Sequence, residues 1–146
     1  MHRDAQWPHP GGVLHIVRRP FPSVYFCNIL RRYSPLGDLL ASGSKDKSVR
    51  LWCMPSDGST PACTCKLPEH TATVWSVAFS PNGLQLASSA GDGSIQLWRL
   101  CAGGTVVSPS KALAAQTGLA NAAIAYNPRG RQLVSSSGDE RLNVYL

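Results

Sequence analysis

The sequence has few charged residues and no long apolar run. Only 15% of the 146 residues are charged, against 43% that are hydrophobic, which is the balance of a globular domain and not of a disordered chain. Glycine, proline or polar residues interrupt every apolar stretch well before the ~18 consecutive residues that a membrane-spanning helix needs. The composition therefore predicts one globular domain with its own core and no membrane span.

The composition of the N-terminal residues does not favour a secretory signal. After Arg3 and Asp4 the chain continues with Trp7, Pro8 and Pro10, where a signal peptide would have its apolar segment. The five cysteines are an odd number, which does not favour a complete disulfide framework. We therefore expect reduced thiols in an intracellular compartment, either the cytoplasm or the nucleus.

Acidic residues are scarce, and the basic excess is concentrated in residues 1–33. The chain has 14 lysines and arginines against 8 acidic residues, and residues 1–33 contain five arginines and one aspartate. Such a segment is either a solvated basic arm or a contact for nucleic acid or an acidic partner. We interpret residues 1–33 as a divergent basic segment, and a nucleic-acid-associated module acting through it is the alternative function.

The motifs of the common enzyme and cofactor sites are absent. No Gly-x-Ser-x-Gly elbow accompanies the serines, and no glycine turn is followed by the Gly-Lys-Ser/Thr of a phosphate loop. Cys63 and Cys65 lack the second pair of ligands that a closed zinc site requires, and the scattered N-terminal histidines, His2, His9 and His15, have no cysteine or acidic partners. We therefore predict no catalytic residue, no metal and no cofactor.

The chain instead contains a threefold internal repeat. The copies are "SPLGDLLASGSKDKSVRLW" at 34–52, "SPNGLQLASSAGDGSIQLW" at 80–98 and "NPRGRQLVSSSGDERLNVY" at 127–145. Their prolines, Pro35, Pro81 and Pro128, recur at intervals of 46 and 47 residues, and a glycine, an aspartate and an aromatic residue keep step with them. A period of this length is typical of repeat architectures.

Each copy has the pattern of a small antiparallel meander. A Pro-x-Gly turn precedes a short apolar run such as 84–87, a second turn follows, and residues 94–98 then alternate with period two. Residues 74–79 supply a further strand upstream of the proline. Residues 63–67 and 111–115 are candidate fourth strands, although the second is alanine-rich and is equally compatible with a helix.

The segment from His70 to Trp98 resembles a WD40 repeat, and the resemblance extends over residues 34–146. It implies an all-β fold, a portion of a β-propeller with about three four-stranded antiparallel blades at 34–69, 70–116 and 117–146. Propellers close with roughly four to eight blades, so this chain alone does not close a ring. We expect a fragment or shortened form of a larger propeller, a two-chain ring, or a strand at 13–17 that covers the open edge.

In WD40 proteins four residues form a buried hydrogen-bonded tetrad, which the resemblance assigns to His70, Ser88, Asp92 and Trp98. The expected order runs from Trp98 through Ser88 and His70 to Asp92. We prefer this structural role to a catalytic triad, because the serine recurs in copies without a histidine. Partial tetrads are expected at Ser42, Asp46 and Trp52 and at Ser135, Asp139 and Tyr145, with Val24 and Thr117 where the histidines would stand.

The resemblance also implies a non-catalytic scaffold that binds other proteins or peptides and assembles a multiprotein complex. The family's contact positions fall on Thr73, Trp75, Gly91 and Lys45, with Ala122 matching Trp75 in the third copy. Trp75 is either an exposed anchor or a core residue beneath the first blade. The stretches "HTATV" and "ASGSKDKSVRLW" are similar to those of centriole-associated WD40 proteins.

Residues upstream of Tyr33 do not match the repeat pattern. Arg31 stands where Val77 stands in the second copy. A buried arginine at this position would be costly unless it were paired. The first copy is therefore expected to begin at residue 34.

Overall fold

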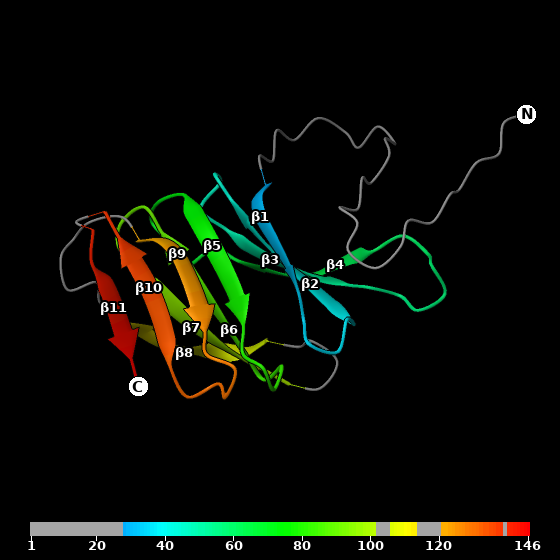
Figure 1. Ribbon diagram of the computed structural model, residues 1–146. Coiled ribbons are helices and arrows are strands. Elements are labelled where there is room, and N and C mark those ends of the chain that lie inside the picture. Colours follow the sequence, from blue (N-terminus) through cyan, green and yellow to red (C-terminus); the bar gives the residue numbers. More distant parts are fainter. Residues whose placement is uncertain (1–27, 102–105, 114–120, 139) are drawn as a thin grey trace, which may run out of the picture.

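The described part of the chain folds into three antiparallel sheets placed side by side (Figure 1). A computed structural model describes residues 28–101, 106–113, 121–138 and 140–146. The strands are β1 (Asn28–Tyr33), β2 (Leu39–Ser44), β3 (Val49–Cys53), β4 (Ala62–Leu67), β5 (Val74–Phe79), β6 (Gln85–Ala90), β7 (Ile95–Leu100), β8 (Val106–Leu113), β9 (Asn121–Tyr126), β10 (Leu133–Ser137) and β11 (Leu142–Tyr145).

Each sheet is a meander of consecutive strands and corresponds to one propeller blade. The strand orders are β1-β2-β3-β4 in the first blade, β5-β6-β7-β8 in the second and β9-β10-β11 in the third. All regular elements of the described residues are strands, and none of these residues lies in a helix that could cross a membrane. The predicted all-β fold of three blades in an unclosed arrangement is confirmed.

Two segments that the sequence left open are assigned by strand pairing. β8 pairs with β7 from Ile95↔Leu113 to Leu100↔Val106, so the alanine-rich segment begins as a strand and not as a helix. β1 pairs with β2, which places residues 28–33 in the first blade. The boundary expected after residue 33 therefore falls inside a blade.

Arg31 does not carry the burial cost that its alignment with Val77 suggested. Arg31 pairs with Ser42 as Val77 pairs with Ser88, so the two residues occupy matching places in their blades. Val77 is only 1% exposed because the first blade packs against it, whereas Arg31 lies exposed on the face of the first blade turned away from the second. The charge stays in water because no described blade covers this face.

The Pro-x-Gly turns form the same backbone structure three times. The amide nitrogens of Gly37, Gly83 and Gly130 donate to the carbonyl oxygens three residues earlier at 2.9–3.0 Å, and all three glycines have positive φ. The turns also stack from blade to blade. A Cβ on Gly83 would lie 3.8 Å from Cδ of Pro35, and one on Gly130 would lie 3.2 Å from Cδ of Pro81.

The turn between the second and third strands of each blade also needs a left-handed residue. The positive-φ residue is Lys47 in the first blade (69°), Gly93 in the second (80°) and Glu140 in the third (65°). Each donates its backbone N–H to the carbonyl oxygen three residues earlier, at 3.1–3.2 Å. Two of the three blades therefore have a residue with a side chain at a positive-φ position, where glycine would be the least strained residue.

The hydrophobic core lies between the blades. Leu51 and Val49 of the first blade pack against Trp98 and Leu86 of the second, and all four are less than 2% exposed. A second cluster joins the second blade to the third and includes Ala87, Ile95, Ile124 and Leu133. The second blade thus presents an apolar face to the first blade and another to the third.

Candidate functional site

Ser88 is the centre of a buried hydrogen-bonded group in the second blade. Its Oγ accepts from Nε1 of Trp98 at 3.0 Å and lies 2.7 Å from Nε2 of His70. Ser88 is at the middle of β6, Trp98 on β7, and His70 in the loop before β5. All three side chains are at most 4% exposed. The structure therefore brings together three of the four residues expected in the tetrad.

Asp92 does not contact His70 as the sequence analysis expected. Nδ1 of His70 instead lies 3.0 Å from Oγ of Ser94. The Asp92 carboxylate accepts the backbone N–H groups of Ser94 at 2.9 Å and Thr71 at 3.2 Å, and also the Thr71 hydroxyl. The carboxylate turns toward these two N–H groups because neither is part of the strand ladders and each needs an acceptor.

Ser94 joins the two parts of the group. Burial raises the pKa of Asp92, but hydrogen bonds from the side chains and backbones of Ser94 and Thr71 outweigh it and hold the pKa well below its usual range. The Ser94 hydroxyl thus donates to Asp92 and accepts Nδ1–H of His70. His70 Nε2 then accepts the Ser88 hydroxyl, and every member of the chain is satisfied with a neutral imidazole.

The charge state of His70 agrees with this arrangement. Burial lowers the pKa of His70, and the nearby Asp92 carboxylate offsets only part of that effect. The imidazole therefore remains neutral at physiological pH. Ser88 is fully buried between His70 and Trp98, so its Oγ is enclosed by its own partners and presents no nucleophile to a substrate.

The first blade has the tryptophan–serine and aspartate–serine hydrogen bonds of this group. Nε1 of Trp52 donates to Oγ of Ser42 at 3.0 Å. Asp46 accepts from the backbone N–H of Ser48 at 3.0 Å and from its hydroxyl at 2.5 Å. Its second oxygen lies 3.2 Å from Nη2 of Arg50, so an ion pair supplies the partner that Thr71 supplies in the second blade. Val24 lies outside the described residues.

The third blade departs further from the pattern. Ser135 is fully buried on β10. The Tyr145 hydroxyl, which stands in the place of the tryptophan N–H, is buried without a hydrogen-bond partner among the described residues. Asp139 and Thr117 lie outside the described residues.

Trp75 lies at the surface, where the sequence analysis had left open whether it is core. The side chain is 41% exposed at the start of β5. It packs against Gly91, since a Cβ there would lie 3.0 Å from Nε1 of Trp75. The Gly91 N–H donates to the carbonyl oxygen of Thr73 at 2.9 Å, which holds the two segments together. Lys45 is exposed, and the Ala122 side chain lies outside the described ones.

The cysteines do not form a metal site in the described part of the chain. Sγ of Cys63 donates to the Cys65 carbonyl oxygen at 3.6 Å, and no three histidine, cysteine or acidic side chains among the described residues converge. Cys27 and the N-terminal histidines lie outside this part, as does the candidate strand at 13–17.

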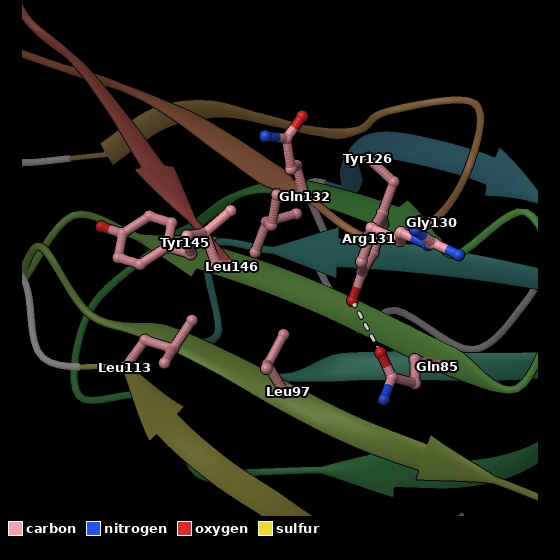
Figure 2. A pocket seen from close by; sticks show the side chains of 10 residues that line it. Gln85, Leu97, Leu113, Tyr126, Gly130, Arg131, Gln132, Tyr145 and Leu146 are labelled. Carbon is pink, nitrogen blue, oxygen red and sulfur yellow. Dashed lines mark hydrogen bonds between the residues drawn. The ribbon is translucent and has the colours of Figure 1, made fainter.

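A cavity between the second and third blades is a feature that the sequence analysis missed. Its volume is about 260 Å³, and Figure 2 shows the side chains around it. One end is formed by Tyr145, Leu146 and Leu113, and the other by Tyr126, Gln85 and Arg131. Burial raises the pKa of Tyr126 to about 12, so its phenol stays protonated. No motif marks the cavity, because its lining comes from six separate segments.

The fold defines the class of protein, a portion of a β-propeller, and comparisons with known proteins define the family. The family model "WD domain, G-beta repeat" matches residues 21–53 and 61–99. The chain therefore belongs to the WD40-repeat family. The first match begins upstream of residue 34, in agreement with the place of β1 in the first blade.

Among solved structures, the chain is similar to the β-propeller domain of Cps50 (Swd1) from Myceliophteria thermophila. The TM-score is 0.66 at 21% identity, over 80% of this chain. The similarity shows the fold, and the chain spans 35% of the length of that domain's chain. No curated protein sequence matches. The likeness to centriole-associated proteins has no support among these matches.

Proposed function

We propose that this chain is a protein-interaction scaffold that binds a segment of another protein through the surface formed by Trp75, Thr73, Gly91 and Lys45. The observation that carries the proposal is the exposed indole of Trp75, which is held in place by its packing on Gly91. Tryptophan concentrates binding energy at interfaces, because it combines a large apolar area with few rotatable bonds. WD40 propellers generally act by binding other proteins, and the family match supports this class of function.

The proposal extends to assembly and location. A shortened form of a larger propeller fits a chain that spans 35% of its structural neighbour's length. Such a form would bring partner proteins together in the cytoplasm or the nucleus, where its exposed cysteines, Cys53, Cys63 and Cys101, would stay reduced.

The test compares partner capture by the intact chain and by two variants. Trp75→Ala removes the proposed anchor, and Leu36→Ala is the matched control, because Leu36 is 83% exposed and lies in the first Pro-x-Gly turn. Proteins that cross-link to the intact chain in cells should be lost with Trp75→Ala and retained with Leu36→Ala. The melting temperatures of both variants should equal that of the intact chain.

Two results would contradict the proposal. Equal loss of capture and of thermal stability in Trp75→Ala would make Trp75 a packing residue. Capture that disappears on deletion of residues 1–27 but survives Trp75→Ala would favour the alternative basic module, whose described arginines, Arg31 and Arg32, are both exposed.

A further inference from the structure

The three Pro-x-Gly turns lie at the same end of their blades. They follow β1, β5 and β9 and lie along the lower side of the molecule in Figure 1. The second and third turns are in contact, since a Cβ on Gly130 would lie 3.2 Å from Cδ of Pro81. Trp75 lies at the opposite end of the second blade, where β5 begins. Binding at these turns is therefore separate from the function proposed above.

The second turn presents an exposed leucine on a fixed backbone. Leu84 is 52% exposed. Its N–H donates to Oδ1 of Asn82 at 3.0 Å, and its carbonyl oxygen accepts the N–H of Leu100 at 2.9 Å. The matching residues of the other two turns are Asp38 and Arg131, so the repeat does not require an apolar residue at this place. The side chain of Leu84 is therefore available for contact with another molecule.

Three exposed arginines lie near this leucine. Arg129 and Arg131 belong to the third turn, and Arg99 lies on β7. Gln85 follows Leu84 and pairs with Arg99 across the strands. Gln85 also lines the cavity of Figure 2 together with Arg131. None of the three arginines forms an ion pair among the described residues. We call the surface formed by these residues the arginine surface: Leu84, Arg99, Arg129 and Arg131.

Acidic side chains lie at the other end of the blades. The turn between the second and third strands of each blade contains one that the structure describes, at Asp46, Asp92 and Glu140. The second and third Pro-x-Gly turns, residues 80–84 and 127–131, contain no acidic residue. The arginine surface is therefore a local excess of positive charge, which fits an acidic partner.

The form of the turn accounts for the exposure of the two arginines of the third turn. Their counterparts in the second turn, Asn82 and Leu84, are both exposed although the third blade packs against the second. Cys53 is the counterpart of Arg99 in the first blade, and it is exposed although the second blade packs against the first. These positions therefore stay open to a partner where one blade packs on the next.

We propose that the arginine surface binds an acidic segment of another protein that carries one leucine-sized side chain. The apolar side chain of the segment packs on Leu84. Carboxylates beside it pair with Arg99 of the second blade and with the two arginines of the third turn. The ion pairs steer the segment to the surface and fix its position, and the apolar contact adds affinity.

Nucleic acid fits this surface less well than an acidic segment of a protein does. Sites for single-stranded nucleic acid combine basic residues with aromatic side chains on which the bases stack. The exposed aromatic residues of the described part of the chain are Tyr33 and Trp75, and neither lies in the second or third turn. The exposed Leu84 also has no role in contacts with phosphates.

A second copy of this chain is also a poorer occupant. At the acidic end of the blades, Asp46 and Asp92 already accept hydrogen bonds from residues of their own chain. Two copies would each carry the net charge of +6 and would repel each other. The oligomeric state of the intact chain tests this argument.

The test uses the full chain and a fluorescein-labelled synthetic peptide, DEELEED. Fluorescence anisotropy should show saturable binding that weakens as salt is added, because salt screens exposed charges. Replacing the leucine of the peptide by serine should weaken binding about fivefold, the size expected for partial burial of one leucine side chain. A peptide with lysine in place of every acidic residue should not bind.

Variants of the chain test the two kinds of contact. Arg129→Glu and Arg131→Glu should each weaken binding about threefold, the size expected for one exposed ion pair, and the control Arg31→Glu on β1 should leave binding unchanged. Leu84→Ser should weaken binding of DEELEED about fivefold but should not further weaken binding of the serine peptide. Its control is Leu142→Ser, because Leu142 is 71% exposed at the other end of the blades.

Trp75→Ala should leave peptide binding unchanged, so failure of this proposal and failure of the proposed function are distinguishable. Equal melting temperatures would show that the variants are folded. Three results would overturn the proposal. The first is full binding of the peptide by a folded variant that carries both Arg129→Glu and Arg131→Glu. The second is tighter binding of a single-stranded oligothymidylate than of the peptide, unaffected by Leu84→Ser, because nucleic acid would then be the occupant. The third is a dimer of the intact chain, measured by light scattering, that Arg131→Glu converts to a monomer.

Discussion

Replacement of Asp92 by alanine tests the corrected hydrogen-bond group of the second blade. Asp92 accepts the N–H and hydroxyl of Thr71 and the N–H of Ser94, and its loss leaves these donors to water or to no partner. Hydrogen bonds to charged groups contribute about 1.5–3 kcal/mol, and the partial exposure of this carboxylate reduces that value. We expect the free energy of unfolding to fall by about 1–3 kcal/mol.

Thermal unfolding at neutral pH measures this loss. For a chain of this size, 1 kcal/mol corresponds to about 2–4 °C in Tm, so a loss of 2 kcal/mol would lower Tm by about 4–8 °C. Asp57→Ala is the control, because Asp57 also caps a serine N–H, that of Ser59, but is fully exposed. Its Tm should not change.

The pH dependence adds a second readout through Asp92→Asn. Burial raises the pKa of Asp92, but its hydrogen bonds lower the pKa by more than burial raises it. The carboxylate of the folded state therefore stays ionised at pH values below its unfolded pKa of 3.8. The stabilisation is complete above that unfolded pKa and is lost as pH falls toward the folded pKa. The Tm difference between wild type and Asp92→Asn should therefore shrink as pH falls below about 4.

The reasoning would be refuted if Asp92→Ala unfolded at the wild-type Tm at neutral pH. It would also be refuted if Asp57→Ala lost as much, because the effect would then reflect turn capping in general and not the group around Ser94.

Three further predictions concern single positions, each measured by chemical denaturation. Lys47→Gly should stabilise the chain by up to about 1 kcal/mol because φ at Lys47 is 69°, and a destabilised variant would mean that its side chain contributes more than the strain costs. Gly43→Ala should cost about 1–3 kcal/mol, since a Cβ there would lie 2.8 Å from Cγ1 of Val74, and an unchanged stability would show that the first two blades can move apart. Tyr145→Phe removes a buried hydroxyl that has no partner and should leave stability equal or raise it by up to about 1 kcal/mol, whereas a loss would reveal a hydrogen bond to that oxygen.

The repeat made the fold predictable. Pro35, Pro81 and Pro128 mark turns with the same backbone hydrogen bond, and the strands expected at 84–87 and 94–98 overlap β6 and β7. The first strand was missed because Arg31 contradicts the pattern of a buried strand. The side chains described on that strand, those of residues 31–33, are all exposed, and the sequence does not tell which residues a neighbouring blade covers.

The candidate site was predictable in its members but not in its connections. Spacing identified His70, Ser88 and Trp98, because the repeat aligns them with a known pattern. It did not distinguish Asp92 from Ser94 as the partner of Nδ1, since both lie on the same turn and a 3.0 Å contact is decided by side-chain rotation. The cavity was invisible for a different reason, because it depends on packing between two blades.

The stacked Pro-x-Gly turns determine where in this chain an insertion or deletion is tolerated. Pro35 lies against Gly83 and Pro81 lies near Gly130, so each turn fixes its successor in space irrespective of the residues between them. The intervals between these prolines nevertheless differ by one residue. The extra residue falls outside the aligned segments, so insertions between blades should be absorbed there, whereas one inserted between a proline and its glycine would uncouple every blade that follows.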